Sequence, residues 1–315
     1  MPQADYPHTA EPFPPPFSAS LLHPRHWLTW LAMGIWYCIA QLPVTWQYAL
    51  GRKLGHLLLK LGGTRVKVTS INIQRCLPEL SQQEQQRLIR ESFESAAIGL
   101  MEVGMGWWLP QWRFKKLCHY EGLEHIEHAR QQNRGILLIT GHFTPMEIAA
   151  RMIGNRIPCR LLYRKNNNPV FEWVSSRRRA HHMTEMVPHK AIKHFLKCLE
   201  AGDTAIYLTD QSYGARHSTF APFFGIETAT IVKTAQYASA TNAIVMPVQY
   251  GRRKNNSGYF LKFYPPLENF PSGNEKADAI TTNEWVEKFA RENPEQYFWQ
   301  HRRFKHVPPD VEPFY

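Results

Sequence analysis

Residues 135–151 read GILLITGHFTPMEIAAR, and this stretch decides the fold class. Its first six residues form an apolar run that begins at a glycine, which is typical of a strand buried on both faces of a parallel sheet. From Pro145 onward the apolar residues recur at helical spacing, so a helix follows the strand within a few residues. A strand that leads into a helix in this way is the repeating unit of α/β domains.

The same alternation continues toward the C-terminus. Residues 158–163 (PCRLLY) and 204–209 (TAIYLT) predict two more buried strands of a parallel sheet. Helical patterns accompany these strands at residues 145–153, 170–180 and 191–201. Two further runs rich in β-forming residues follow at residues 243–249 and 259–264. We therefore predict an α/β fold with a mostly parallel central sheet flanked by helices.

The N-terminal part of the chain resembles a membrane anchor. Residues 27–51 carry no charged side chain, and a run of about 25 residues is long enough to span a bilayer. Gln41 and Pro43 weaken its second half, so a kinked or interfacial helix is the alternative. An amphipathic helical pattern follows at residues 83–106. We predict three parts: a Pro-rich leader at 1–24, an N-terminal membrane helix as anchor at 25–51, and one folded domain at 52–315.

The charge and the cysteines restrict the partners and the compartment. The chain has 37 basic and 26 acidic residues, a formal net charge of +11. Such a charge favours nucleic acid, anionic lipid, phosphorylated substrates or an acidic protein. Five widely separated cysteines without a C-x-x-C pair indicate free thiols, which fits a domain that faces a reducing cytoplasm.

His142 and Glu147 are the candidate catalytic residues. His142 directly follows the predicted strand, and open α/β sheets bind their ligands at the carboxyl ends of strands. Thr144 as N-cap and Pro145 as first helical residue would place Glu147 third in the helix, where it completes a capping box. The same turn also brings the Glu147 carboxylate toward the imidazole of His142. The role of Glu147 therefore stays open between helix capping and orientation of the histidine.

A histidine held by a carboxylate can take a proton from an attacking hydroxyl, so the pair indicates acyl transfer to an alcohol. The sequence has no G-x-S-x-G elbow, which favours direct attack by the acceptor over a covalent acyl-enzyme. It also has no H-E-x-x-H or similar pattern with a third ligand, so we predict no catalytic metal.

The spacing from His142 to Glu147 resembles the H-x4-D/E motif of the glycerolipid and lipid A acyltransferases. Four longer blocks are similar, in the same order, to the lauroyltransferase branch of the lipid A biosynthesis late acyltransferase family, which acts on Kdo2-lipid IVA. They read FSASLLHPRHWLTW (17–30), YRKNNNPVFEWVSSRRR (163–179), TDQSYGARHSTFAPFFG (209–225) and PEQYFWQHRRFK (294–305). The sequence departs from the family at Lys165, where a proline is common.

The resemblance implies a glycerolipid-acyltransferase-like fold and roles for individual residues. His142 would be the general base and Glu147 the residue that orients it. Arg179 and Asp210 fall on functional positions of the family: Arg179 would hold an oxyanion or a phosphate, and Asp210 would hold Arg179 or the acceptor. Arg164 would be a weaker contact to phosphate or thioester.

The resemblance also implies the reaction. A lauroyl chain would move from acyl carrier protein to a hydroxyl of a 3-hydroxyacyl chain of Kdo2-lipid IVA, at the bacterial inner membrane and without a cofactor other than the thioester co-substrate. Two alternatives stay open: the sibling myristoyltransferase, and a non-enzymatic basic protein that binds membrane or nucleic acid. Five aromatic residues are candidates to line an acyl tunnel: Trp107, Trp108, Trp112, Phe223 and Phe224.

Overall fold

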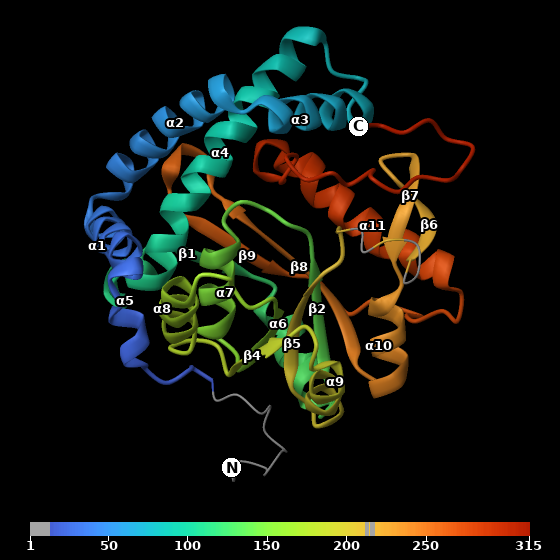
Figure 1. Ribbon diagram of the computed structural model, residues 1–315. Helices are drawn as coiled ribbons and strands as arrows, with labels where there is room; N and C mark the ends of the chain where they lie inside the picture. The colour runs from blue at the N-terminus through green and yellow to red at the C-terminus, as the bar shows by residue number, and fades with distance from the viewer. Residues whose placement is uncertain (1–12, 212–213, 215–217) are drawn as a thin grey trace.

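A seven-stranded sheet forms the centre of the protein (Figure 1). The computed structural model describes residues 13–211, 214 and 218–315, so residues 1–12 of the predicted leader lie outside the described residues. Across the sheet the strand order is β1-β9-β8-β2-β5-β3-β4. The strands are β1 (Cys118–Glu121), β2 (Ile136–Thr140), β3 (Cys159–Tyr163), β4 (Glu185–Pro188), β5 (Thr204–Leu208), β8 (Ile244–Arg252) and β9 (Tyr259–Phe263).

The sheet is mostly parallel, which confirms the predicted fold class. The five strands from β8 through β2, β5 and β3 to β4 run parallel to one another, whereas β9 pairs antiparallel with β8 and parallel with β1. The predicted strands at residues 135–140, 158–163 and 204–209 correspond to β2, β3 and β5. The short edge strands β1 and β4 were not predicted, because sequences such as CHYE and EMVP lack a continuous apolar run.

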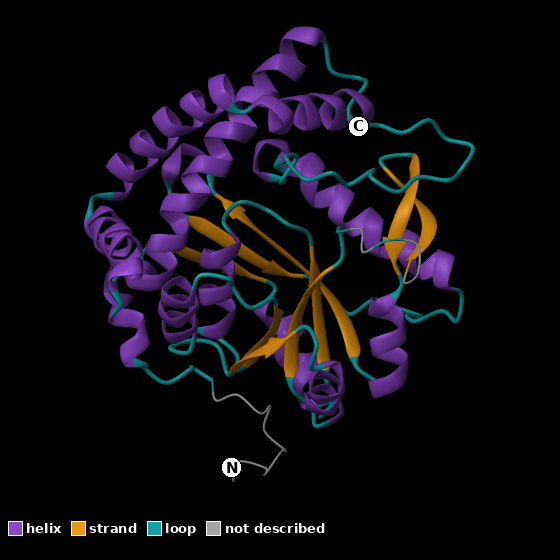
Figure 2. Cartoon of the chain, in the orientation of Figure 1, coloured by secondary structure: helices purple, strands orange, loops and turns teal. Residues whose placement is uncertain are grey.

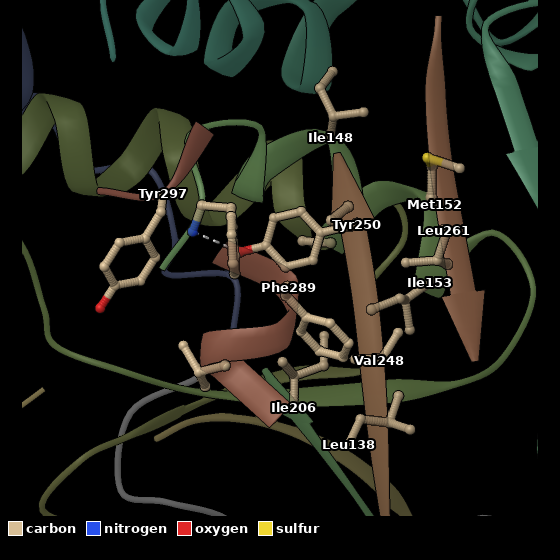
Figure 3. Close-up of a cluster of buried hydrophobic side chains, with 14 of the residues drawn as sticks. Leu138, Ile148, Met152, Ile153, Ile206, Val248, Tyr250, Leu261, Phe289 and Tyr297 are labelled. Atoms are coloured by element: carbon tan, nitrogen blue, oxygen red, sulfur yellow. Dashed lines mark hydrogen bonds between the residues drawn. The ribbon is translucent and has the colours of Figure 1, made fainter. Parts of the chain in front are cut away.

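Helices cover both faces of the sheet (Figure 2). Successive residues of a strand point to opposite faces. Leu138 of β2 therefore joins the larger core with side chains of α4, α7 and α11, while Leu137 joins a second core with α9 and α10. Figure 3 shows part of this larger core, in which Leu138 lies near Ile206 and Val248. The helices are α3 (Gly63–Cys76), α4 (Gln82–Trp108), α5 (Gln111–Lys115), α6 (Leu123–Gln131), α7 (Met146–Gly154), α8 (Pro169–Arg179), α9 (Ile192–Glu200), α10 (Lys233–Thr241) and α11 (Glu275–Glu292).

The long helix α4 confirms the amphipathic pattern predicted at residues 83–106. It begins with a capping box, in which the side chains of Ser81 and Glu84 bond each other's backbone amides. Pro110 follows closely after its last residue, and the missing N–H of proline is typical of a helix end. One side of α4 packs against α7, so this helix helps to position the loop between β2 and α7.

The predicted membrane helix at residues 25–51 is corrected by the structure. Two helices occupy this region, α1 (Trp27–Gln41) and α2 (Val44–Leu61), with a break at Leu42 and Pro43. The amide of Gln47 donates to the carbonyls of Ala40 and Leu42, which satisfies the backbone at the break. Among the described residues, we find no helix that combines the length and the apolar character needed to cross a bilayer.

A separate two-stranded hairpin, β6 (Ser218–Phe223) and β7 (Ile226–Ile231), packs against α11. Its turn needs left-handed backbone at Phe224 and Gly225, with φ values of 52° and 73°. The Phe224 amide donates to Glu287 of α11 over 2.6 Å, which fastens the turn.

Candidate active site

The parallel pairing of β2 with β5 brings His142 next to Asp210. Thr140 and Leu208 are register partners at the ends of these strands, and each strand is followed two residues later by one member of the pair. The Thr209 amide donates to the Thr140 carbonyl over 3.0 Å, so the register continues past the last paired residues. His142 therefore lies at the carboxyl end of a central strand, as the sequence predicts.

Asp210 holds His142 by two hydrogen bonds. The His142 Nδ1 lies 2.6 Å from Oδ1 of Asp210, and the His142 amide donates to Oδ2 over 2.8 Å. Burial alone would raise the pKa of Asp210, but the charge and hydrogen bonds of His142 lower it to about 2. An ionised carboxylate can only accept, so Nδ1 carries a hydrogen, and in the neutral imidazole Nε2 is then the nitrogen with the free lone pair.

Gly141 makes this close approach possible. A Cβ atom at this position would lie 2.7 Å from Val286 Cγ1 and 3.3 Å from Asp210 Oδ2. The first distance is shorter than real Cβ contacts, so any other residue would push the loop away from α11.

Gln211 faces the second ring nitrogen of His142. Its Nε2 lies 3.0 Å from His142 Nε2, and with Nδ1 protonated the imidazole accepts this bond. Gln211 is not among the site residues predicted from the sequence, although it directly follows Asp210 after a buried strand. The amide occupies the position from which a hydroxyl would give its proton to the base.

The backbone around His142 is held by the C-terminal part of the chain. Tyr250 of β8 donates its hydroxyl hydrogen to the Gly141 carbonyl over 3.0 Å and accepts from the Phe143 amide over 3.3 Å. The Phe298 amide donates to the His142 carbonyl over 3.0 Å. Figure 3 shows Tyr250 and Tyr297 beside this loop. These bonds fix the position of the imidazole from both sides of the loop.

The predicted capping box at Glu147 is wrong. α7 begins at Met146 with Pro145 as N-cap, and no side chain caps this end of the helix among the described residues. Thr144 instead bonds Ser95 of α4 over 2.9 Å and accepts from Arg252 of β8. Its hydroxyl is therefore not available to the first turn of α7.

Glu147 pairs with Arg179 rather than with His142. Arg179 donates from Nε to Oε1 over 2.9 Å and from a terminal nitrogen to Oε2 over 2.7 Å, and Trp107 donates to Oε1 over 2.6 Å. No hydrogen bond joins Glu147 to His142 within residues 13–211, 214 and 218–315. Glu147 was predicted to orient His142, but Asp210 makes this contact. Arg179 was predicted as a partner of Asp210, but it pairs with Glu147.

The Glu147 carboxylate is ionised in spite of its burial. Burial would raise its pKa, but the charge and hydrogen bonds of Arg179, together with Trp107, hold the pKa below its usual value. Gly106 of α4 allows the side chain to lie there, because a Cβ at Gly106 would come within 2.9 Å of Glu147 Cγ. α4 therefore shapes the site from outside the H-x4-E motif.

The other predicted residues, Arg164 and the five aromatic residues, lie in different parts of the molecule. Arg164 is exposed just beyond the end of β3, and no bond to His142, Asp210 or Glu147 is seen in the described part of the chain. Trp107 and Trp108 join an aromatic cluster with α1 and α8, whereas Trp112 is exposed. Phe223 and Phe224 pack into the larger core instead. Trp107 and Trp108 therefore remain the candidates to line an acyl tunnel.

A group that could hold a metal ion lies elsewhere. Ligand atoms of Glu185, His194 and Cys198 lie within 4.8 Å of one another. Glu185 begins β4, so this group is at the amino end of the strands, whereas His142 follows a carboxyl end. Arg160 also pairs with Glu185. The geometry gives this group no contact with the candidate active site.

Known proteins resemble this chain along most of its length. The profile of the family described as bacterial lipid A biosynthesis acyltransferase matches residues 14–306. The lipid A biosynthesis lauroyltransferase of Escherichia coli (strain K12) is 39% identical over 94% of this chain and 97% of that protein. The palmitoleoyltransferase of the same strain is 34% identical, over 93% and 95% of the two chains, and the myristoyltransferase is 26% identical, over 95% and 94%. The family predicted from the sequence motifs is confirmed: the chain belongs to the bacterial lipid A biosynthesis acyltransferases.

Proposed function

We propose that this acyltransferase moves a lauroyl chain from the thioester of acyl carrier protein to a hydroxyl of a 3-hydroxyacyl chain of Kdo2-lipid IVA. The observation that carries the chemistry is the 2.6 Å bond between His142 and Asp210, which leaves the other ring nitrogen as a base. The lauroyl donor is favoured because the lauroyltransferase is 39% identical, compared with 34% for the palmitoleoyltransferase and 26% for the myristoyltransferase. The myristoyl sibling remains the second candidate, and family membership argues against a purely charge-driven binding protein.

In the proposed reaction, His142 Nε2 takes the proton of the acceptor hydroxyl while its oxygen attacks the thioester carbonyl carbon. A C–O bond forms, and the C–S bond then breaks. His142 returns the proton to the leaving thiolate, so the imidazole ends as it began. Asp210 stabilises the imidazolium between these steps, and Gln211 gives up its place at Nε2 to the hydroxyl.

We propose that Arg179 stabilises the negative charge that develops on the thioester carbonyl oxygen during the attack. A guanidinium carries five N–H groups, and the Glu147 pair uses two of them, from Nε and one terminal nitrogen. The remaining donors are held in a fixed direction by Glu147 and Trp107, which is the preorganisation that stabilises an oxyanion. Arg164 stays a proposed outer contact to the donor.

The proposed partners follow from charge and exposure. Acyl carrier protein is acidic, and a net charge of +11 would attract it. Leu28, Leu31 and Ile35 of α1 are 78%, 60% and 54% exposed, and such an apolar helix face suits the surface of the inner membrane. We propose that α1 lies on the cytoplasmic leaflet, with the folded domain in the cytoplasm.

The test follows acyl transfer from lauroyl acyl carrier protein to Kdo2-lipid IVA by mass spectrometry in detergent. The wild type should add one lauroyl group. His142→Ala should lose most of the rate, whereas His128→Ala, which removes an exposed histidine of α6, should keep it. A wild type that accepts only the penta-acylated precursor would identify the myristoyl sibling. A wild type that transfers nothing to any lipid A precursor would refute the proposed substrate.

A further inference from the structure

Two adjoining cavities lie where α1 passes α8 and the ends of α4 and α7, and Trp107 joins the second of them to the Glu147–Arg179 pair. The first has a volume of about 680 Å³. Its walls are mostly apolar side chains of α1, α4 and α8, among them Trp30, Met33, Tyr37, Trp108, Trp173 and Val174. The volume lies within the range of about 300 to 1,000 Å³ that is typical of ligand pockets.

The second cavity has a volume of about 380 Å³ and is basic. Its polar walls include Arg151, Asn155, Arg178, His181 and His182, and none of its lining residues is acidic. The two cavities share four lining residues, namely Tyr37, Trp108, Arg178 and His181. An apolar space thus opens onto a basic one, which is the arrangement that an anionic amphiphile requires.

We propose that the two cavities bind one phosphate-bearing lipid, with its hydrocarbon in the first cavity and its phosphate in the second. The identification of this lipid as the glycolipid acceptor rests on the proposed function. The recognition itself rests on phosphate and hydrocarbon, which a membrane phospholipid also offers.

The charge of the second cavity is not balanced by the protein. Arg151 is 8% exposed, and it donates to the carbonyls of Met105 and Gly106 and to Gln111. These carbonyls end α4 and carry only about half of a negative charge together. Neither Arg151 nor Arg178 forms an ion pair within the described ranges of the chain. A bound phosphate would supply the missing anion, because isolated buried charge is costly.

His182 adds a neutral donor to the same wall. Burial lowers the pKa of His182 to about 4, so its imidazole is uncharged at neutral pH. Its Nε2 is buried and makes no hydrogen bond in the described part of the structure. A turn of this side chain toward the cavity would bring Nε2 within reach of a phosphate oxygen, which would remove the cost of an unpaired polar atom.

The positions of the two cavities fit access from a lipid surface and delivery to the site. Trp30, Gly34 and Tyr37 also line a shallow apolar hollow on the outside of α1, next to the exposed Leu31. On the inner side, Trp107 lines the basic cavity and donates to Glu147. A lipid held here therefore lies between the exposed face of α1 and the Glu147–Arg179 pair.

Two variants test the two cavities separately. Arg178→Gln removes a cation from the second cavity without touching the α4 carbonyls. Gly34→Leu adds a side chain at the rim that the first cavity shares with the outer hollow, where a Cβ at Gly34 meets no atom within 4 Å. Arg130→Gln, at the exposed end of α6, is the matched change of charge.

Binding is measured as the rise in unfolding temperature on adding lipid in uncharged detergent micelles. The probes are Kdo2-lipid IVA, the same lipid after phosphatase treatment, and phosphatidylglycerol. The wild type and Arg130→Gln should be stabilised by phosphorylated lipid, whereas Arg178→Gln and Gly34→Leu should lose most of this rise. Stabilisation by Kdo2-lipid IVA assigns the site to the acceptor, and stabilisation by phosphatidylglycerol assigns it to membrane phospholipid. An equal response to the phosphatase-treated lipid, or no loss in either variant, overturns the proposal.

Turnover gives an independent readout. Arg178→Gln should raise the KM for the phosphorylated acceptor by about tenfold, the effect of one charged hydrogen bond, and should leave kcat within about twofold. The KM for the phosphatase-treated acceptor should not change. Because the binding measurement needs no turnover, a wrong assignment of the reaction would leave its result intact. A KM and a lipid binding in Arg178→Gln that both equal those of the wild type would refute the proposed phosphate site.

Discussion

His142 and Asp210 are 68 positions apart in the chain, yet their side chains meet at 2.6 Å. The contact depends on the register between β2 and β5, in which Thr140 lies opposite Leu208. A shift of one residue in either strand would turn one of the two side chains to the other face of the sheet. The geometry of the proposed base is therefore a property of sheet pairing.

Asp210→Asn should lower kcat by about 10³- to 10⁴-fold without unfolding the protein. An asparagine can donate its amide hydrogen to Nδ1, which moves the imidazole hydrogen to Nε2 and removes the base. Acyl-transfer rates measured alongside the unfolding temperature check this result. Asn274→Ala, which removes the N-cap of α11, a helix without a proposed catalytic residue, controls for a general loss of stability. A rate within tenfold of the wild type would show that Asp210 does not set the tautomer.

Arg179→Met should lower the free energy of unfolding by about 3 to 5 kcal/mol, because it leaves Glu147 charged and buried without its partner. The dependence on pH should also reverse. In the wild type the pKa of Glu147 is lowered, so its contribution is present above the unfolded pKa and is lost as pH falls. Without Arg179, burial raises the pKa of Glu147, and the contribution of Glu147 to stability rises as pH falls from 7 to 5. Denaturant unfolding at both pH values measures the slopes, and Arg179→Met with Glu147→Gln should abolish the reversed slope.

His182→Gln should make the protein less sensitive to acid. The pKa of His182 is about 4 in the folded protein, below its usual value of 6.5, so the unfolded chain binds the additional proton between these values. The wild type therefore loses stability as pH falls from about 6.5 to about 4, and the variant should lose less. Unfolding temperatures across this interval give the comparison. His128→Gln, at an exposed position, should follow the wild type; identical slopes for all three proteins would contradict the burial of His182 as the cause.

Gly106→Ala should destabilise the protein by about 1 to 3 kcal/mol and lower activity, because its methyl group would lie 2.9 Å from Glu147 Cγ. Gly34→Ala is the matched helical control for stability, since a Cβ there meets nothing within 4 Å. Replacement of an unconstrained helical glycine should stabilise α1 by about 0.5 to 1 kcal/mol. Thermal unfolding of both variants tests the comparison. Equal stabilities would mean that the contact between α4 and Glu147 relaxes freely.

The central strands could be predicted because each is a short continuous run of apolar residues, a signal that needs no information from the rest of the chain. β2 is buried along its whole length, so each of its residues must be compatible with a core on both faces. The edge strands lack this constraint, and β4 carries Glu185 at its start. The parallel direction of β2 and β5 could also be predicted from the helices between them, whereas the opposite direction of β9 depends on a short connection after β8.

The candidate site shows where local spacing misleads. Glu147 is five residues from His142, and a turn between them made contact plausible, but Arg179 from another helix takes both carboxylate oxygens. Asp210 was singled out through the family resemblance only. Its contact with His142 followed from two strands that end in register, a signal present in the sequence once β2 and β5 are placed side by side.

The face of α4 toward the site carries four residues at positions 95, 99, 102 and 106. Ser95 and Gly99 approach Thr144, the buried Glu102 pairs with Arg252 over 3.2 Å, and Gly106 admits Glu147. One residue added to or deleted from this stretch would rotate the following part of the helix by about 100°. Such an insertion would separate several of these partners at once. During divergence of the chain, lengths should therefore change in the connecting segments, while α4 keeps a fixed number of residues between Ser95 and Gly106.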